Sequence, residues 1–377
     1  MKKIAIFTSN YLPDIKAGGP VRSIENLVNA IGSDCIIHII TLDSLMISTN
    51  KSTIYIKEVG KSKVYYLKNN IDKYAKILTT VLNGNYDFIY INSFFDLTFS
   101  LYPLLISKLI RKQPKVIIAP RGQFSNSAIT YKKMKKCVFL NLTKSINIYD
   151  NCIWHFTSDY EKIDVMKKIR VKESYIIPNI NKDINASIID KDKKPGELII
   201  ICVGRVSYMK NYPYLFECLK YIKKAKIRIK IIGNIENKKI YRKCKEIASN
   251  LDDISVHWYG LCDEYFIENE INKSHLFVSP TLGENFGHSI YEAISLGCPV
   301  LISDNTPIKD LEQYNAGYVV PLGDKERFID IINMFVDINN KEYNNICNSV
   351  IDYYNKCIKP NRDKSSIKYR KMFGEYR

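Results

Sequence analysis

The sequence lacks a hydrophobic run long enough to cross a membrane. A membrane-spanning helix needs about 18 or more apolar residues, and the best candidate, Leu97 to Ile110, is shorter and contains Pro103 and Lys108. We interpret it as a buried helix. The apolar stretch Ile4–Phe7 is likewise too short for the hydrophobic part of a secretory signal. We therefore expect a cytoplasmic protein.

The sequence also lacks the residue spacing of a metal site. Its ten cysteines are scattered singly and include no C-x-x-C pair, so neither a zinc ribbon nor a redox dithiol is indicated. The five histidines form no i, i+4 pair and no other ligand spacing. Cys202 and Cys298 stand inside apolar runs, where a thiol is usually a buried core group. We predict no structural metal.

Acidic residues are scarce relative to basic ones. There are 56 lysines and arginines against 39 aspartates and glutamates, a net charge of +17, and segment 131–172 is especially basic. Such a surplus favours polyanionic partners, namely nucleic acid, phosphorylated substrates or an anionic membrane surface. A solvated, lysine-rich face explains any single lysine equally well. Because no nucleic-acid-binding motif accompanies the charge, we expect no nucleic-acid partner.

Short strand-like runs alternate with longer amphipathic stretches, as in parallel sheets covered on both faces. The rhythm restarts after the polar stretch from Asn181 to Gly196, which we interpret as a domain junction. The pattern predicts an α/β fold with two doubly wound domains that bind ligands at the carboxyl ends of their strands. The predicted strands are Lys3–Thr8, Cys35–Thr41, Phe88–Ile91, Val116–Ala119, Ile153–Thr157, Leu198–Val203, Ile227–Ile232, Ser255–Tyr259, Leu276–Ser279 and Val300–Ser303, and the predicted helices include Gly19–Ile31, Tyr74–Leu82 and Leu97–Arg111.

The segment 284–293, with sequence ENFGHSIYEA, is the strongest local signal. It follows a predicted strand and precedes Gly297, so we expect Glu284 in a loop, Gly287 at a helix N-terminus and Glu292 one turn inside that helix. A helix N-terminus presents free N–H groups to a phosphate, and a glycine lets the backbone approach a ligand closely. The two carboxylates suit recognition of hydroxyl groups on a sugar and a ribose. Surface acids on an ordinary strand–loop–helix unit fit the same spacing.

Two further loops follow predicted strands. In the first, Gly204 permits a tight turn, and Arg205 and Lys210 place two cations where they suit a diphosphate, although such a pair is usually just solvated. In the second, Gly18 and Gly19 open the next helix, and such a loop can approach a phosphate or sugar through its backbone. Neither a G-x-G-x-x-G fingerprint nor a Walker A motif is present.

Taken together, these segments resemble family 4 of the retaining glycosyltransferases with the GT-B fold. The resemblance spans nearly the whole chain and also includes 297–300 (GCPV), like the family's G-x-P-V, and the segment 315–320. It implies two Rossmann-like domains with an interdomain cleft. Residues 1–180 would bind the acceptor and residues 195–360 the nucleotide sugar, and a C-terminal helix at 361–377 would cross back to the first domain.

The resemblance implies transfer of a sugar with retention from a nucleotide-sugar donor, with a UDP-sugar expected first and a GDP-sugar second. Arg205 and Lys210 would bind the donor diphosphate, and Glu284 would contact the donor sugar, so these three form the predicted catalytic set. Glu292 would hold the ribose hydroxyls. The departing phosphate oxygen would take the acceptor's proton, and no metal or cofactor would be required. The other implied donor contacts are Gly18, Gly19, Gly204, Asn285, Phe286, Gly287 and His288.

The first domain departs from the family pattern. Many members carry a histidine at a strand end near the donor sugar, whereas here the strands lead into Asn92-Ser93 and into Pro120-Arg121-Gly122. The Pro-Arg-Gly version resembles a branch of the family and implies that Arg121 faces a phosphate or the acceptor. The stretch from Thr157 to Glu161 resembles the family's Thr-Ser-x-x-Glu, which implies that Ser158, at a helix N-terminus, faces the cleft.

The expected acceptor is a glycan or a polyprenyl-diphosphate-linked sugar in surface polysaccharide synthesis, such as O-antigen or capsule. Because segment 131–172 is basic, we expect peripheral contact with the anionic inner face of the plasma membrane. One rival is another GT-B enzyme, such as a nucleotide-sugar 2-epimerase or a phosphorylase, which does not usually combine Glu-x7-Glu with the Gly-Arg…Lys loop. The other is a non-catalytic nucleotide- or polyanion-binding protein, which the charge favours and the donor-site residues disfavour.

Overall fold

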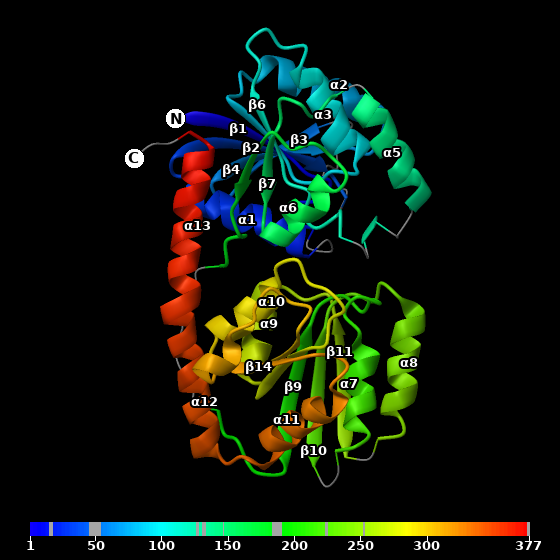
Figure 1. The fold of residues 1–377 in the computed structure, drawn as a ribbon, viewed down its shortest axis with the longest axis vertical. Coiled ribbons are helices and arrows are strands. Elements are labelled where there is room, and N and C mark those ends of the chain that lie inside the picture. The colour runs from blue at the N-terminus through cyan, green and yellow to red at the C-terminus, as the bar shows by residue number, and fades with distance from the viewer. Residues whose placement is uncertain are drawn as a thin grey trace. The chain divides into compact units, whose positions relative to one another are not determined.

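The chain forms two compact units (Figure 1). Unit 1 comprises Met1–Ile180 and Arg362–Arg377, and unit 2 comprises Asn181–Asn361. Parts of the predicted glycine loop (15–17) and of the predicted domain junction (183–190) lie outside the described residues. The computed structural model describes residues 1–14, 18–44, 54–125, 128–129, 133–145, 147–182, 191–222, 225–251 and 253–374.

Unit 1 is built on an eight-stranded sheet in the order β3-β4-β2-β1-β5-β6-β7-β8. Neighbouring strands are parallel except β3, which pairs antiparallel with β4 at the edge of the sheet. The strands are β1 (Lys2–Phe7), β2 (Cys35–Leu42), β3 (Ile54–Val59), β4 (Ser62–Leu67), β5 (Phe88–Ile91), β6 (Lys115–Ile118), β7 (Ile153–Phe156) and β8 (Glu173–Ile176). The helices are α1 (Gly19–Ile31), α2 (Asp72–Asn83), the π-helix η2 (Leu97–Leu101), α3 (Tyr102–Ser107), α5 (Lys133–Ser145), α6 (Asp159–Met166) and the end of α13 (Lys359–Met372).

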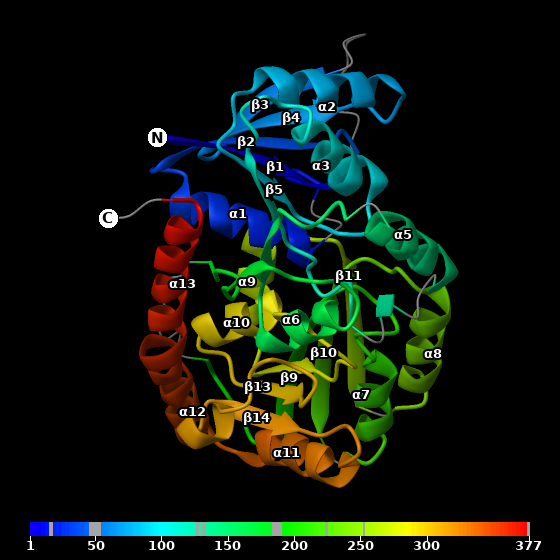
Figure 2. The same ribbon diagram turned by 45° about the horizontal axis from the view of Figure 1, so that its top comes forward.

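The unit 1 sheet is buried on both faces because successive side chains of a strand point to opposite sides. Along β1, Ile4 and Ile6 enter one core and Ala5 and Phe7 enter the other. Helices α1 and α13 pack against the first face, whereas α2, α3, α5 and α6 pack against the second (Figures 1 and 2). This two-sided burial explains why the central strands are nearly continuous apolar runs.

Unit 2 has a six-stranded, fully parallel sheet in the order β11-β10-β9-β12-β13-β14. Helices α7, α8 and α11 cover one face, and α9, α10 and η4 cover the other. The strands are β9 (Glu197–Val203), β10 (Lys226–Ile232), β11 (Ile254–Gly260), β12 (Leu276–Ser279), β13 (Val300–Ser303) and β14 (Gly317–Val320). The helices are α7 (Tyr212–Leu219), α8 (Lys238–Ala248), α9 (Glu264–Asn272), α10 (His288–Ser295), the 3-10 helix η3 (Leu311–Tyr314), α11 (Lys325–Asp337), α12 (Asn340–Tyr353) and the π-helix η4 (Tyr354–Ile358).

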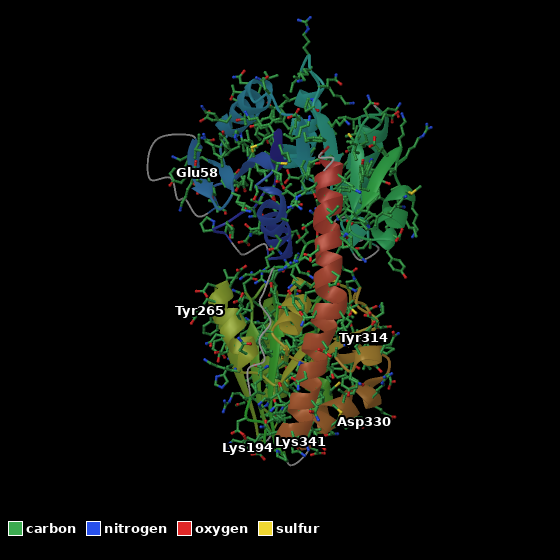
Figure 3. All side chains as sticks on the ribbon, turned by 90° about the vertical axis from the view of Figure 1, so that its left-hand side faces the viewer. Glu58, Lys194, Tyr265, Tyr314, Asp330 and Lys341 are labelled. Atoms are coloured by element: carbon green, nitrogen blue, oxygen red, sulfur yellow. The ribbon has the colours of Figure 1, made fainter. Side chains whose placement is uncertain are left out.

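Helices α12, η4 and α13 follow one another without a break in the chain (Figure 3). The last turns of α13 belong to unit 1, where Tyr369 and Phe373 are buried in the core that α1 also lines. Arg370 anchors the same turns, because its Nε donates to the Asp34 carboxylate at 2.8 Å and its Nη2 donates to the Ala30 carbonyl at 2.8 Å. The C-terminal segment therefore completes the unit that the N-terminal segment begins.

The predicted architecture of two doubly wound α/β domains is confirmed, and the bounds of α1, β5, β12 and β13 agree with those expected. The hairpin of β3 and β4 was missed because β3 lies at the sheet edge, where solvent exposure removes the need for an apolar run. The predicted helix Leu97–Arg111 is wrong in its extent. It is split into η2 and α3, ends at Ser107, and leaves Leu97 and Leu109 exposed.

The described part of the chain contains no helix that combines the length and the apolar character needed to cross a membrane.

Candidate active site

Most predicted site residues lie at the carboxyl edge of the unit 2 sheet. From β9 the strand order runs one way through β10 to β11, and from β12 it runs the other way to β14. The loops after β9 and β12 therefore leave neighbouring strands in opposite directions. Open α/β sheets bind their ligands at such a switch point. Arg205 and Lys210 follow β9, and Glu284 follows β12.

Hydrogen bonds hold these two loops together. Lys210 Nζ donates to Glu284 Oε2 at 2.6 Å, and the two side chains are only 19% and 22% exposed. The Thr281 hydroxyl and the Leu282 amide both donate to the carbonyl of Met209, at 2.9 and 2.8 Å. The lysine and the carboxylate that the sequence places far apart therefore form one charged centre.

Gly204 is required for this arrangement because the stem of Lys210 lies directly against it. A Cβ atom built on Gly204 would stand 2.7 Å from Lys210 Cε, and the backbone φ of Gly204 is 152°, which other residues rarely adopt. The backbone bends at Gly204. Gly204 also makes room for the Lys210 side chain, and nothing in the local sequence predicts this second role.

Arg205 also has a carboxylate partner. Its Nη1 donates to Glu236 Oε2 at 2.7 Å, and both side chains are about half exposed, 52% and 49%. Glu236 follows β10, the strand beside β9, and was not singled out from the sequence. Its position after a strand of the same sheet edge is the signal that could have identified it.

Helix α10 begins as the sequence predicts. Gly287 is its N-cap residue with a left-handed φ of 88°, and among the described residues no side chain caps this end. A Cβ on Gly287 would come within 3.0 Å of Ile290 Cδ1 and 3.3 Å of Glu284 Cγ, so only glycine fits without displacing its neighbours. The amide groups of the first turn and the positive end of the helix dipole are therefore directed into the same loop as Glu284.

Glu292 lies one turn inside α10 and lines a small, open hollow. Lys182, on the same hollow, pairs with Glu264 at 2.9 Å and with Glu268 at 2.6 Å. Burial lowers the pKa of Lys182, but its two carboxylate partners outweigh burial and raise that pKa to about 12. The hollow is lined by Asn181, Lys182, His288, Tyr291, Glu292 and Ser295.

Three further predicted site residues, Asn285, Phe286 and His288, lie at the start of α10. Asn285 and Phe286 belong to the loop between Glu284 and Gly287. The Phe286 ring stacks on Tyr291 with 4.7 Å between ring centroids and meets His288 edge-on at 4.7 Å. Aromatic packing therefore fixes the backbone that the resemblance assigns to the donor diphosphate.

Gly18, Gly19, Arg121 and Ser158 lie in unit 1. Gly18 caps α1 with a φ of 64° and has open space where a side chain would stand, and Gly19 is the first residue of α1. Ser158 caps α6, and its hydroxyl accepts a hydrogen bond from the Glu161 amide at 3.2 Å. The ligand contacts proposed for these residues stay predictions.

The side chain of Arg121 is engaged by polar groups of unit 1 itself. Its Nε donates to Asn92 Oδ1 at 2.7 Å, its Nη2 donates to the Tyr90 hydroxyl at 2.7 Å, and its Nη1 donates to the Asn179 side chain. The backbone of Arg121 is left-handed (φ 55°), a conformation that costs about 1–2 kcal/mol for residues other than glycine. These side-chain bonds offset that cost and fix the loop after β6.

Glu161 holds the same loop from the other side. Its Oε1 accepts from the Gly122 amide at 2.5 Å, and its Oε2 accepts from the amide and hydroxyl of Thr157 at 2.7 and 2.8 Å. The Ser-x-x-Glu pattern from Ser158 to Glu161 signals a helix start. The reach of Glu161 to Gly122 is visible only in the tertiary structure.

His155, on β7, is buried and is linked to Arg121 through the Tyr90 hydroxyl. Because the Arg121 guanidinium can only donate, the Tyr90 oxygen accepts from it and the Tyr90 hydroxyl donates to His155 Nδ1 at 2.7 Å. Because a carbonyl can only accept, His155 Nε2 donates to the Ile177 carbonyl at 2.9 Å. This chain requires a neutral imidazole. Burial first, and then the charge of Arg121, lower the pKa of His155 to about 3.

The described cysteines are all free thiols. Within the described ranges, no three histidine, cysteine, aspartate or glutamate side chains come together in a way that could hold a metal ion.

One protein-family model matches a continuous segment in the second half of the chain. The family model described as "Glycosyl transferases group 1" matches residues 183–350, which include Arg205, Lys210, Glu284 and Glu292. No curated protein sequence matches the chain.

Solved structures share the fold over the full length. A trehalose-6-phosphate synthase has a TM-score of 0.69 at 10% identity, with 100% of both chains covered. The Anabaena protein HepE, solved with UDP and glucose, has a TM-score of 0.69 at 14% identity, covering 99% of this chain and 98% of that one. A sucrose-phosphate synthase from Thermosynechococcus elongatus has a TM-score of 0.66 at 15% identity, covering 99% of both chains.

The fold of both units resembles these structures, and the switch-point loops of unit 2 lie inside the segment that the family model matches. The chain carries a domain of the group 1 glycosyltransferases at residues 183–350, and it is a glycosyltransferase with the GT-B fold.

Proposed function

We propose that this enzyme transfers a sugar, with retention of its anomeric configuration, from a nucleotide-diphosphate sugar to a glycan or lipid-linked acceptor. It would thereby act as a member of family 4. The observation that carries the proposal is the charged centre of Lys210 and Glu284 at the switch point of unit 2, with Arg205 two residues beyond the end of β9. The combination suits a ligand that has both a diphosphate and hydroxyl groups.

Each part of the donor has a matching group in unit 2. The guanidinium of Arg205, the ammonium of Lys210 and the N-terminus of α10 are the positive groups for the diphosphate, whose negative charge increases as the sugar leaves. Glu284 supplies an acceptor for the sugar hydroxyls. Glu292, one turn inside α10, supplies an acceptor for the ribose hydroxyls.

The proposed reaction needs no basic residue of the protein. The bond between the anomeric carbon and the diphosphate oxygen breaks, and the acceptor oxygen bonds to the same face of that carbon. The departing phosphate oxygen takes the acceptor's proton. Positive side chains and the helix dipole would neutralise the leaving group, so activity is proposed to need no divalent metal.

UDP is the first candidate nucleotide and GDP the second. Three similar structures were solved with uridine ligands: the E. coli trehalose-phosphate protein with UDP-2-fluoro glucose, and HepE with UDP and glucose and with UDP-glucose. For the acceptor, the net charge of +17 supports an anionic molecule. A polyprenyl-diphosphate-linked sugar in surface polysaccharide synthesis, at the inner face of the membrane, is proposed first. A free sugar phosphate, suggested by the names of the two similar synthases, is second.

A thermal-shift screen with UDP, GDP, ADP and TDP tests the donor site. We expect the melting temperature to rise selectively with one diphosphate, UDP first, and the rise to disappear in Arg205→Ala. The matched control is Arg327→Ala, which removes an equally exposed arginine of unit 2 that pairs with Glu312; it should keep the rise. If none of the diphosphates raises the melting temperature of the wild-type protein, the proposed donor site is wrong.

Product analysis distinguishes the proposed retaining transferase from an epimerase and from an inverting transferase. Incubation with the selected nucleotide sugar and no acceptor should leave the sugar configuration unchanged, whereas an epimerase would isomerise the donor alone. With an acceptor, proton NMR of the new linkage should show the anomeric configuration of the donor. An inverted linkage would contradict the proposed retention, and loss of activity on EDTA treatment would contradict the proposed independence of metal.

A further inference from the structure

The net charge of the protein is confined to one of its two units. Unit 1 contains 32 lysines and arginines against 15 aspartates and glutamates, which leaves +17, whereas unit 2 contains 24 of each and is neutral. The nucleotide-binding unit therefore contributes nothing to the surplus. A partner attracted by the charge should meet unit 1.

Helix α5 of unit 1 exposes an apolar stripe. Met134, Val138 and Leu142 recur every four residues and thus follow one face of the helix, and their exposures are 84%, 58% and 66%. Single exposed apolar residues are ordinary, but three in a row on one helix face are what an apolar partner would cover. We call these three side chains the α5 stripe.

The opposite face of α5 is the one that packs on the unit. Leu140 is buried in the core of unit 1, and Phe139 packs against Phe94 with 5.6 Å between ring centroids. Lys136 Nζ donates to the Ala128 carbonyl at 2.7 Å. The inward face is therefore satisfied by the protein, and the α5 stripe is left over as a second, outward apolar face.

The charges on α5 indicate which partner would cover the stripe. The helix contains four lysines and no acidic residue, and Lys135 is exposed beside the stripe. An apolar strip flanked by lysines is the pattern of a helix that lies in the interface of an anionic bilayer, its apolar side chains among the acyl chains and its ammonium groups at the phosphates. A protein partner would supply apolar area but would not require the cationic bias of the whole unit.

We propose that unit 1 docks on an anionic lipid surface through α5, with the α5 stripe inserted into the bilayer interface and Lys135 on the lipid phosphates. This rests on the lipid-linked acceptor of the proposed function and names the surface that would bring the enzyme to it. Figures 1 and 2 place α5 at the periphery of unit 1, beside α3. Neutral unit 2 would make no electrostatic contribution to docking.

Vesicle flotation tests the proposal on the full chain. We expect binding to vesicles of phosphatidylglycerol and phosphatidylcholine, and none to phosphatidylcholine alone. Binding should weaken as salt rises from about 0.05 to 0.5 M, because salt screens lysine–phosphate attraction. The triple variant Met134→Gln, Val138→Gln and Leu142→Gln keeps helix-forming residues at exposed positions and should bind roughly tenfold more weakly.

The matched control is Tyr265→Gln, which removes an 82% exposed apolar side chain from unit 2 (Figure 3) and should leave flotation unchanged. Wild-type protein that fails to bind anionic vesicles, or a triple variant that binds as tightly as the wild type, would overturn the proposal. A wild-type dimer that the triple variant converts to a monomer, with no vesicle binding, would instead assign the stripe to a second copy of the chain. The UDP thermal shift of the same samples reports the donor site separately.

Discussion

Lys210 Nζ and Glu284 Oε2 lie 2.6 Å apart although 74 residues separate them in the sequence. Both side chains are largely removed from solvent. In such surroundings the charge of each group stabilises the other, and removal of one leaves its partner partly buried without compensation. The two residues therefore form one functional unit, and the consequences of changing either should be interpreted together.

Substitution of this pair should reduce turnover far more than it reduces stability. We expect Glu284→Gln and Lys210→Met each to lower kcat by roughly 10²-fold or more, because both are proposed to interact with the donor as charge moves to the diphosphate. The double variant should lose much less than the product of the two single effects, since the residues are in direct contact. Steady-state kinetics of the three variants, alongside their melting temperatures, measure this; multiplicative losses would show that the two groups act independently.

The pair of Arg205 and Glu236 should behave differently because both side chains are half exposed. A surface ion pair contributes about 0–1 kcal/mol, so the donor diphosphate can replace the carboxylate as the partner of Arg205. Glu236→Gln should therefore leave the free energy of unfolding nearly unchanged and tighten UDP binding by a few fold. Calorimetric titration with UDP checks this, and weaker binding would indicate that Glu236 positions the guanidinium.

The buried pair of Lys230 and Glu270 joins β10 to α9 at 2.8 Å, with side-chain exposures of 6% and 10%. Lys230→Met should lower the free energy of unfolding of unit 2 by about 3–5 kcal/mol, because Glu270 then keeps a buried charge that the exposed Lys273, 3.3 Å away, compensates only in part. Replacing both residues, Lys230→Met with Glu270→Leu, should recover most of the loss. Urea unfolding measures the difference, and Arg327→Met at an exposed pair, expected to cost less than about 1 kcal/mol, is the control.

Acid should destabilise unit 1 through His155. Burial and Arg121 lower the folded-state pKa of His155 to about 3, below its ordinary value of 6.5. The unfolded chain therefore binds one more proton than the folded chain between these values. The stabilisation is complete above about pH 6.5 and is lost as the pH falls toward 3.

Urea midpoints measured from pH 7.5 to 5 check this expectation. The midpoint of the wild type should fall with pH, and His155→Gln should flatten the slope without removing it, because burial also lowers the pKa of His38 and His275 to about 4. Leu142→Gln, which replaces an exposed apolar side chain of unit 1 and no titratable group, is the control and should keep the wild-type slope. An unchanged slope in His155→Gln would contradict the proposed neutral chain of hydrogen bonds.

Much of the fold could be predicted from local sequence. Strands β5, β12 and β13 are short apolar runs bounded by polar residues or proline, and α1 begins at the second glycine of a pair, so their limits are encoded within a few residues. The start of α10 at Gly287 was predictable for the same reason. Edge strand β3 was not, because Ile56, Lys57 and Glu58 are exposed and its apolar signal is weak.

The sequence by itself determined the two-domain α/β class, the residue types of the proposed donor site and the positions of its loops after strands. Only the tertiary structure decided which of those residues meet. In unit 2, Lys210 reaches Glu284 because strand order brings their loops to one edge of the sheet. In unit 1, Glu161 reaches Gly122 and Arg121 is engaged by Asn92 for the same reason at the edge of the other sheet. Helix and strand periodicity is a property of adjacent residues, whereas contacts between distant segments depend on the packing of whole sheets, which no short stretch of sequence encodes.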